Sequence, residues 1–250
     1  MKKYTIIIAL LFSFNFIRSQ TSVDSSDFVA FFNANLGYQF PKYDMETWFG
    51  QNANVGGGFS IKTTSNWTFE IGFNYLWGNT IKNKDSVLYS ILTSEKNIID
   101  GNGQYGIINY SEAGWSTMFT IGKIIPISKK YQNSGLWIKA GFGLLQHKIL
   151  IESQDNLIPQ IKDDYRKGYD KLSNGFSASQ FIGYVWLSKR GVKNAFAGFE
   201  FVEGWTKSRR DVDFNTGLPD TKAKFDLLMG VKIGWIISVY KRKPDAFYFN

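Results

Sequence analysis

Five charged side chains share the inward-facing side of segments whose residues alternate between apolar and polar. They are Glu70, Lys139, Glu200, Asp226 and Lys232. A charge inside a narrow interior is costly unless it is paired, and Glu200 and Lys232 are expected at similar heights on neighbouring segments. The five residues therefore predict a salt-bridge network that fills a lumen. A gated ion path, and hence a small channel, is the alternative.

His147 is the only histidine of the chain and could act as a general base. Ser177 or Ser179 could supply a nucleophilic hydroxyl, and Glu152 or Asp155 a carboxylate that orients the imidazole. Nothing in the spacing of these residues brings them within hydrogen-bond reach. We therefore expect a structural role for His147 and keep a lipid-modifying enzyme as the alternative function.

A second pattern lies between residues 206 and 222. Asp211, Asp213, Asn215 and Gly217 match the start of a calcium-binding loop, but Lys222 stands where the terminal glutamate of such a loop belongs. The pattern therefore predicts a turn, with no metal site.

Basic and apolar loop residues suggest contacts with other molecules. Arg209 and Arg210 form a cationic pair that could bind lipopolysaccharide phosphates, since guanidinium groups bind phosphate bidentately. Residues 105–110 are unusually apolar for a loop and include Tyr105 and Tyr110. Exposed apolar segments often mark partner contacts, so we expect envelope proteins as possible partners.

The segment 67–77 shows what kind of element positions these residues. Its sequence places six apolar side chains on one face of a strand: Trp67, Phe69, Ile71, Phe73, Tyr75 and Trp77. Aromatic residues with a polar edge stand at both ends of this face, as they do where strands meet the two surfaces of a bilayer. Ten steps of ~3.3 Å, tilted by about 45°, cover roughly 23 Å along the bilayer normal. The pattern predicts a transmembrane strand.

Seven further segments alternate in the same way, which predicts an all-β, antiparallel, up-and-down transmembrane barrel of eight strands. The expected strands are 28–40, 53–62, 67–77, 115–125, 136–149, 176–187, 195–205 and 225–239. Short connections (63–66, 126–134 and 188–194) alternate with long ones (39–52, 78–114, 150–175 and 206–222). Short periplasmic turns and long extracellular loops are typical of outer-membrane barrels. A ten-stranded barrel that uses residues 105–110 is the alternative.

The remaining composition narrows the class of protein. Lys2 and Lys3 precede an apolar stretch too short to span a membrane as a helix, so residues 1–19 are interpreted as a signal peptide cleaved after Ser19. Residues 20–250 then form a single barrel domain. The absence of cysteine excludes disulfides, thiolate metal sites and a lipoprotein anchor. The net charge of +8 is scattered along the chain, which argues against nucleic-acid binding, and no cofactor is expected.

The signal peptide, the alternating strands, the unequal connections and the aromatic end at residues 247–249 resemble the small OmpA/OmpX-like barrels of Gram-negative bacteria. The resemblance is architectural and covers residues 27–240. It implies an outer-membrane location, contact with outer-membrane lipids and lipopolysaccharide, and recognition of a terminal aromatic residue during assembly. Here residues 241–246 separate the aromatic end from the last strand. We expect a structural or interaction role without catalysis, for example as an accessory to an envelope assembly or secretion machine.

Overall fold

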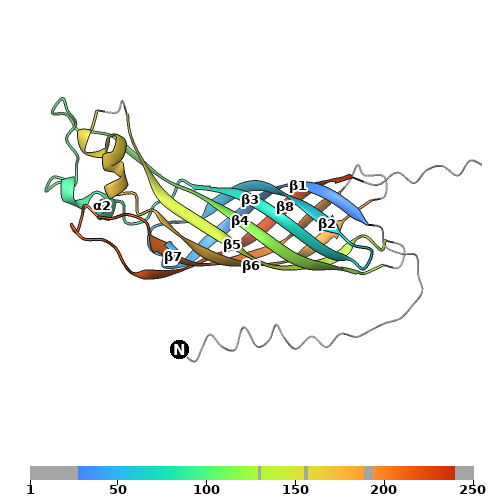
Figure 1. Ribbon diagram of the computed structural model, residues 1–250. Helices are drawn as coiled ribbons and strands as arrows, with labels where there is room; N and C mark the ends of the chain where they lie inside the picture. Colours follow the sequence, from blue (N-terminus) through green and yellow to red (C-terminus); the bar gives the residue numbers. More distant parts are fainter. Residues whose placement is uncertain (1–27, 129–130, 155–156, 189–193, 240–250) are drawn as a thin grey trace, which may run out of the picture.

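A computed structural model describes residues 28–128, 131–154, 157–188 and 194–239. Within these ranges, eight antiparallel strands pair in sequence order, and the last strand pairs with the first to close a barrel (Figure 1). The strands are β1 (Val29–Tyr43), β2 (Asn52–Lys62), β3 (Trp67–Gly78), β4 (Ile108–Pro126), β5 (Gly135–Ser153), β6 (Ser173–Trp186), β7 (Ala195–Ser208) and β8 (Ala223–Val239). The predicted fold class is confirmed. The predicted signal peptide and the aromatic end lie outside the described residues and stay predictions.

The ten-stranded alternative is wrong. Residues 108–110 lengthen β4, and Tyr105 forms only an isolated bridge with Ile99. β4 and β5 run for 19 residues each and pair from Ile108–Ser153 to Pro126–Gly135. They are longer than the expected strands because their outer ends continue the ladder beyond the membrane belt. This paired extension forms an arm above the barrel (Figure 1).

The outside of the barrel is apolar. The exposed large side chains include Phe69, Ile71, Phe73, Tyr75 and Trp77 on β3, and Val231, Ile233, Trp235, Ile237 and Val239 on β8. Ile71 leaves 61% of its surface exposed, although a soluble barrel would bury such a residue inside. A belt of exposed hydrocarbon bordered by Trp and Tyr is compatible with lipid as the solvent.

The inside of the barrel is layered. A lower apolar layer near the short turns consists of Val29, Phe31, Ile124, Trp137, Phe181, Val185, Leu187, Phe196 and Ile236. An upper apolar layer contains Leu76, Met118, Leu145, Val202 and Leu228, all buried. Along β5, β7 and β8, the inward positions between the two layers carry Lys139, Glu200 and Lys232. Gly143 allows β4 and β5 to approach closely, since a β-carbon there would lie 1.8 Å from the carbonyl oxygen of Thr117.

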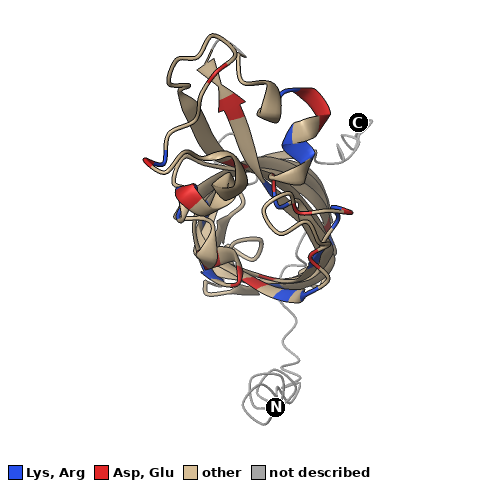
Figure 2. Cartoon of the chain, turned by 90° about the vertical axis from the view of Figure 1, so that its left-hand side faces the viewer, with Lys and Arg blue, Asp and Glu red and all other residues tan. Residues whose placement is uncertain are grey.

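The long connections fold into a packed head at one end of the barrel. The 3₁₀ helix η1 (Met45–Thr47) lies over the mouth, and Met45 and Phe49 are buried in the same cluster as the upper layer. That cluster continues into the head, which also contains α2 (Lys84–Val87), η2 (Tyr89–Ile91), η4 (Pro159–Ile161) and η5 (Asp163–Gly168). Figure 2 shows the head from the loop end, with the strands forming a ring behind it. No helix in the described ranges has the length and apolar character needed to cross a membrane.

Candidate functional site

Four of the five predicted interior charges form two ion pairs, here called the charge layer. Lys139 Nζ lies 3.1 Å from Glu70 Oε2, and Lys232 Nζ lies 2.5 Å from Glu200 Oε1. Ser60 Oγ donates a further hydrogen bond of 3.0 Å to Glu70 Oε2. All four charged side chains are at least 86% buried. Each charge thus has an opposite charge at contact distance, as burial in a narrow interior requires.

Rings of the lower apolar layer contact the charge layer. The Lys139 ammonium lies 4.2 Å from the ring centroid of Trp137, 4.8 Å from that of Phe181 and 5.5 Å from that of Phe196. Ring faces carry partial negative charge, so these contacts stabilise the ammonium while the rings fill the cross-section. The sequence showed the alternation that directs these rings inward, but gave no sign that they surround a lysine.

The space left within the charge layer is small. A cavity of about 20 Å³ is bordered by Glu70, Lys139, Glu200 and Lys232, together with Met118 and other inward residues. A cavity must offer roughly 10–15 Å³ to admit one water molecule. The cavity therefore has room for about one water molecule.

Asp226 does not belong to the charge layer, although the sequence grouped it with the other four residues. Leu228 of the upper apolar layer lies between Asp226 and Lys232 on the inward face of β8. Asp226 Oδ2 instead contacts His147 Nε2 at 2.9 Å and accepts a hydrogen bond of 2.6 Å from Thr206 Oγ1. The barrel thus holds a second polar cluster near its mouth, separated from the first by hydrocarbon.

Glu112 is an interior carboxylate that the sequence interpretation missed. Asn52 Nδ2 donates to both of its carboxylate oxygens, at 3.0 and 3.1 Å, and Glu112 is 2% exposed. The omission arose because the expected strand began at residue 115. Continuing its alternation backwards through Ser116 and Gly114 would have placed Glu112 on the inward face.

The residues proposed for catalysis are not assembled around His147. Ser177 Oγ donates to Met118 Sδ at 3.7 Å, and Ser179 borders the cavity of the charge layer. Glu152 is exposed, and Asp155 lies outside the described residues. His147 Nδ1 has no hydrogen-bond partner in the described part of the chain. The base-to-hydroxyl bond of a nucleophilic triad is therefore missing there.

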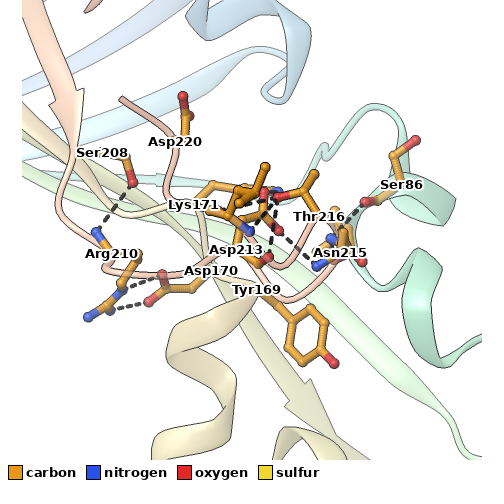
Figure 3. A network of polar contacts seen from close by, with 12 residues as sticks. Ser86, Tyr169, Asp170, Lys171, Ser208, Arg210, Asp213, Asn215, Thr216 and Asp220 are labelled. Atoms are coloured by element: carbon orange, nitrogen blue, oxygen red, sulfur yellow. Dashed lines mark hydrogen bonds and ion pairs between the residues drawn. The ribbon is translucent and has the colours of Figure 1, made fainter. Parts of the chain in front are cut away.

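In the head, the two predicted phosphate-binding arginines already have protein partners (Figure 3). Arg210 binds Asp170 bidentately, with Nε 2.8 Å from Oδ1 and Nη2 2.5 Å from Oδ2. This hydrogen bonding raises the pKa of the Arg210 guanidinium above its ordinary value. Arg209 Nε donates to Asn174 Oδ1. Both side chains connect loops to strands or to other loops, and a phosphate would have to compete with these contacts.

The segment resembling a calcium loop is a junction between three connections (Figure 3). The carboxylate of Asp213 pairs with Lys171, which removes the free charge that a cation would need. Asn215 Nδ2 donates to the carbonyl of Val87 at 2.8 Å, and its Oδ1 accepts from the amide of Ser90 at 3.1 Å. Within the described ranges, no group of three or more His, Cys, Asp or Glu residues could hold a metal ion.

The two predicted contact tyrosines lie in different surroundings. Tyr105 exposes 66% of its surface at the far end of the head. Tyr110 packs against the apolar cluster of the head, and its burial raises the pKa of its hydroxyl to about 12. Of the two, only Tyr105 is available to a partner without rearrangement.

Comparison with known proteins identified similar structures but no sequence family. No protein-family model matches the chain, and no curated protein matches it. Similar solved structures include Ail of Yersinia pestis, crystallised with the heparin analogue sucrose octasulfate; it is 9% identical, covers 84% of this chain and 99% of its own, and has a TM-score of 0.40. Neisserial surface protein A is 8% identical over 82% of this chain and 95% of its own, with a TM-score of 0.42. The outer-membrane protein OprG from Pseudomonas aeruginosa is 10% identical over 86% of this chain and 99% of its own, with a TM-score of 0.35.

The class of the protein rests on its own geometry. A closed antiparallel sheet satisfies its backbone hydrogen bonds internally, and its exterior is hydrocarbon between aromatic girdles. Three connections at the loop end are long, as predicted (79–107, 154–172 and 209–222), but the first (44–51) is as short as 127–134 and 187–194, because β1 extends to Tyr43. The chain is therefore an outer-membrane β-barrel protein, with the architecture of the small OmpA/OmpX-like barrels.

The charge layer yields a prediction about stability. Lys232→Met should lower the free energy of unfolding from detergent micelles by about 3–5 kcal/mol, because it leaves Glu200 buried without its cation. The double variant Lys232→Met/Glu200→Gln should recover most of that loss. Lys96→Met, which breaks the exposed pair with Asp85, is the matched control and should leave unfolding nearly unchanged. Equal losses in the single and double variants would contradict mutual pairing.

Tyr110 yields a prediction about pH. The pKa of its hydroxyl is raised in the folded protein from 10.0 to about 12, so its contribution to stability is complete below pH 10 and is lost as the pH rises through about 12. Ionisation of tyrosine is followed by its absorbance in the native protein and in Tyr110→Phe. The difference between the two titration curves should be centred near pH 12. Tyr105→Phe should still show the ionisation near pH 12. A difference centred near pH 10 would show that Tyr110 is exposed.

Proposed function

We propose that this protein is a non-conducting outer-membrane barrel that uses its head to bind another envelope protein. The partner would be a component of an envelope assembly or secretion machine. The observation that carries this proposal is the contrast between a filled interior and a packed head with an exposed apolar end. We propose no catalytic role, because in the described part of the chain His147 bonds Asp226 through Nε2 and no hydroxyl through either nitrogen.

The layered interior supports the absence of conduction. An ion crossing the barrel would meet the rings of Trp137, Phe181 and Phe196 below the charge layer. It would meet Met118 and Leu228 above that layer. Removing an ion from water costs several kcal/mol in such surroundings, and the charges between the two layers are already paired.

The exposed end of the head supports binding to a protein. Ile99, Tyr105, Ile107 and Leu157 are each at least 40% exposed, and together they are called the apolar tip. Backbone contacts hold them together: Ile99 bridges Tyr105, the amide of Gly101 donates to Leu157, and the amide of Gln154 donates to Ile107. Exposed apolar residues on an ordered support are typical of interaction sites, and tyrosine is enriched at their centres.

A groove on the outer wall supports contact with outer-leaflet lipids. It measures about 600 Å³ and is bordered by Leu227 and Met229 of β8, by Lys42 and Tyr43 of β1, and by Glu46 and Thr47 of η1, with Lys42 opposite Leu227 in register. Lys42 and Lys82 both pair with Glu46, at 3.2 and 3.3 Å, which leaves one net positive charge. Apolar side chains next to a cationic one suit an acyl chain and the phosphate of lipopolysaccharide.

Conductance provides the first test. The purified protein should remain electrically silent in planar bilayers at both polarities, because the two apolar layers close the lumen. A porin incorporated under the same conditions controls for the bilayer. Discrete current steps would overturn the non-conducting proposal and restore the channel alternative.

Site-specific crosslinking tests the apolar tip. A photoreactive residue in place of Tyr105 should capture an envelope protein in intact cells, and Ile107→Ser should reduce capture about fivefold or more, as expected for loss of a central contact. Tyr165 is a matched control, since it is 64% exposed but lies on η5. Capture from position 165 that equals or exceeds capture from position 105 would contradict the assignment.

A further inference from the structure

Two polar side chains interrupt the apolar outer wall of the barrel. Gln180 follows the alternation of β6, in which Phe181 is buried and Ile182 is exposed, so it points outward. Glu203 lies on the outward side of β7, which it shares with the exposed Trp205. Both side chains are partly exposed, and neither forms a hydrogen bond or an ion pair with another described residue. Another molecule can therefore reach both.

Both positions lie between the aromatic ends of their strands. On the outward face of β6, Gln180 is four residues from Phe176 and six residues from Trp186. At ~3.3 Å per residue and a tilt of about 45°, these separations correspond to roughly 9 Å and 14 Å along the bilayer normal. Glu203 is two residues from Trp205, or roughly 5 Å by the same measure. The bilayer core supplies no hydrogen bonds, so polar groups there are costly unless another molecule provides partners.

The rest of this wall is satisfied by the chain itself. Between the aromatic ends, the other outward positions of the described strands are apolar or glycine, apart from residues that are already engaged. Thr117 donates to the carbonyl of Gly72 at 3.2 Å, and the Lys123 ammonium lies 4.9 Å from the ring centroid of Trp67. The described wall thus leaves two polar groups to be satisfied from outside.

Strand register brings these two groups into one patch. Gln180 pairs with Phe201, and Ala178 pairs with Glu203, so Gln180 and Glu203 are diagonal neighbours within reach of long side chains. Ala140 stands beside Gln180 on the other side. The alanines leave room for a second wall to approach, as small residues do where membrane helices pack. Ala140, Ala178, Gln180 and Glu203 are together called the polar patch.

We propose that the polar patch is a dimer interface, at which a second copy of this chain packs wall to wall within the membrane. Two copies inserted in the same direction are related by a two-fold axis along the bilayer normal, so each residue meets residues at its own depth. A primary amide is complementary to itself, because Gln180 of each copy donates to the amide oxygen of Gln180 of the other. The second N–H group of each amide is left for the carboxyl group of Glu203, which accepts with or without its proton.

A second copy suits the patch better than the other molecules of the membrane. Acyl chains carry neither donors nor acceptors, and lipid headgroups lie at the level of the aromatic ends. A different membrane protein would have to present a donor and an acceptor of its own at the depth of Gln180. A second copy presents both by symmetry.

Sedimentation equilibrium of the purified full chain in detergent micelles provides the first test. The protein should sediment as a dimer that dissociates on dilution, and Gln180→Leu should weaken dimerisation about fivefold or more. Leucine suits a lipid-facing position, so this variant should fold, as circular dichroism can verify. Thr117→Val is the matched control, since it also removes a lipid-facing polar group, but one that is bonded within its own chain. It should leave dimerisation unchanged.

Crosslinking in lipid vesicles maps the interface. The chain contains no cysteine, so Ala178→Cys provides a single thiol beside Gln180. A bis-maleimide with a spacer longer than the ~10 Å between packed sheets should join two copies through this thiol. Ala34→Cys, an exposed outward position on β1, should give little dimer, and adding Gln180→Leu to Ala178→Cys should lower the yield.

Four results would overturn the proposal. They are a monomer at every concentration, unchanged dimerisation in folded Gln180→Leu, equal yields from positions 178 and 34, and crosslinking from position 178 in intact cells exclusively to a different protein.

Discussion

Every other feature of this protein depends on the pairing of β1 with β8. In lipid, an unpaired backbone amide or carbonyl costs several kcal/mol, so a sheet can cross the membrane only when its two edges meet. Here the edges meet along residues 30–43 and 226–239, in continuous antiparallel register. Closure then fixes which side chains face lipid and which face the interior, because successive residues in a strand point to opposite sides.

An eight-stranded barrel has an interior just wide enough for side chains, and the chain fills it in layers. Four charged residues are buried there as two pairs formed between strands, Lys139 with Glu70 and Lys232 with Glu200. Near the mouth, His147 and Asp226 bond each other through one atom each, and His147 Nδ1 and Asp226 Oδ1 have no hydrogen-bond partner among the described residues.

The head converts long connections into ordered structure. Asn215 donates a hydrogen bond to Val87 in the connection that contains α2, and Arg210 donates one to Asp170 in the connection that contains η5. Residues from these connections pack in one apolar cluster. The sequence showed that the long loops gather at one end of the molecule, but it did not show how they pack. Their backbones follow no fixed period, so their contacts cannot be deduced from the order of apolar residues.

The sequence by itself determined the strands, the two faces of each strand and the end that carries the long connections, because the two-residue period of a strand is a local property. It also placed Glu200 and Lys232 at similar heights on neighbouring strands, since each stands a similar number of residues from the periplasmic end of its strand. Only the tertiary structure decided that Asp226 pairs with His147, 79 positions away, and that Glu112 lies inside. Those outcomes depend on barrel closure and on the length of β4, which no local pattern specifies.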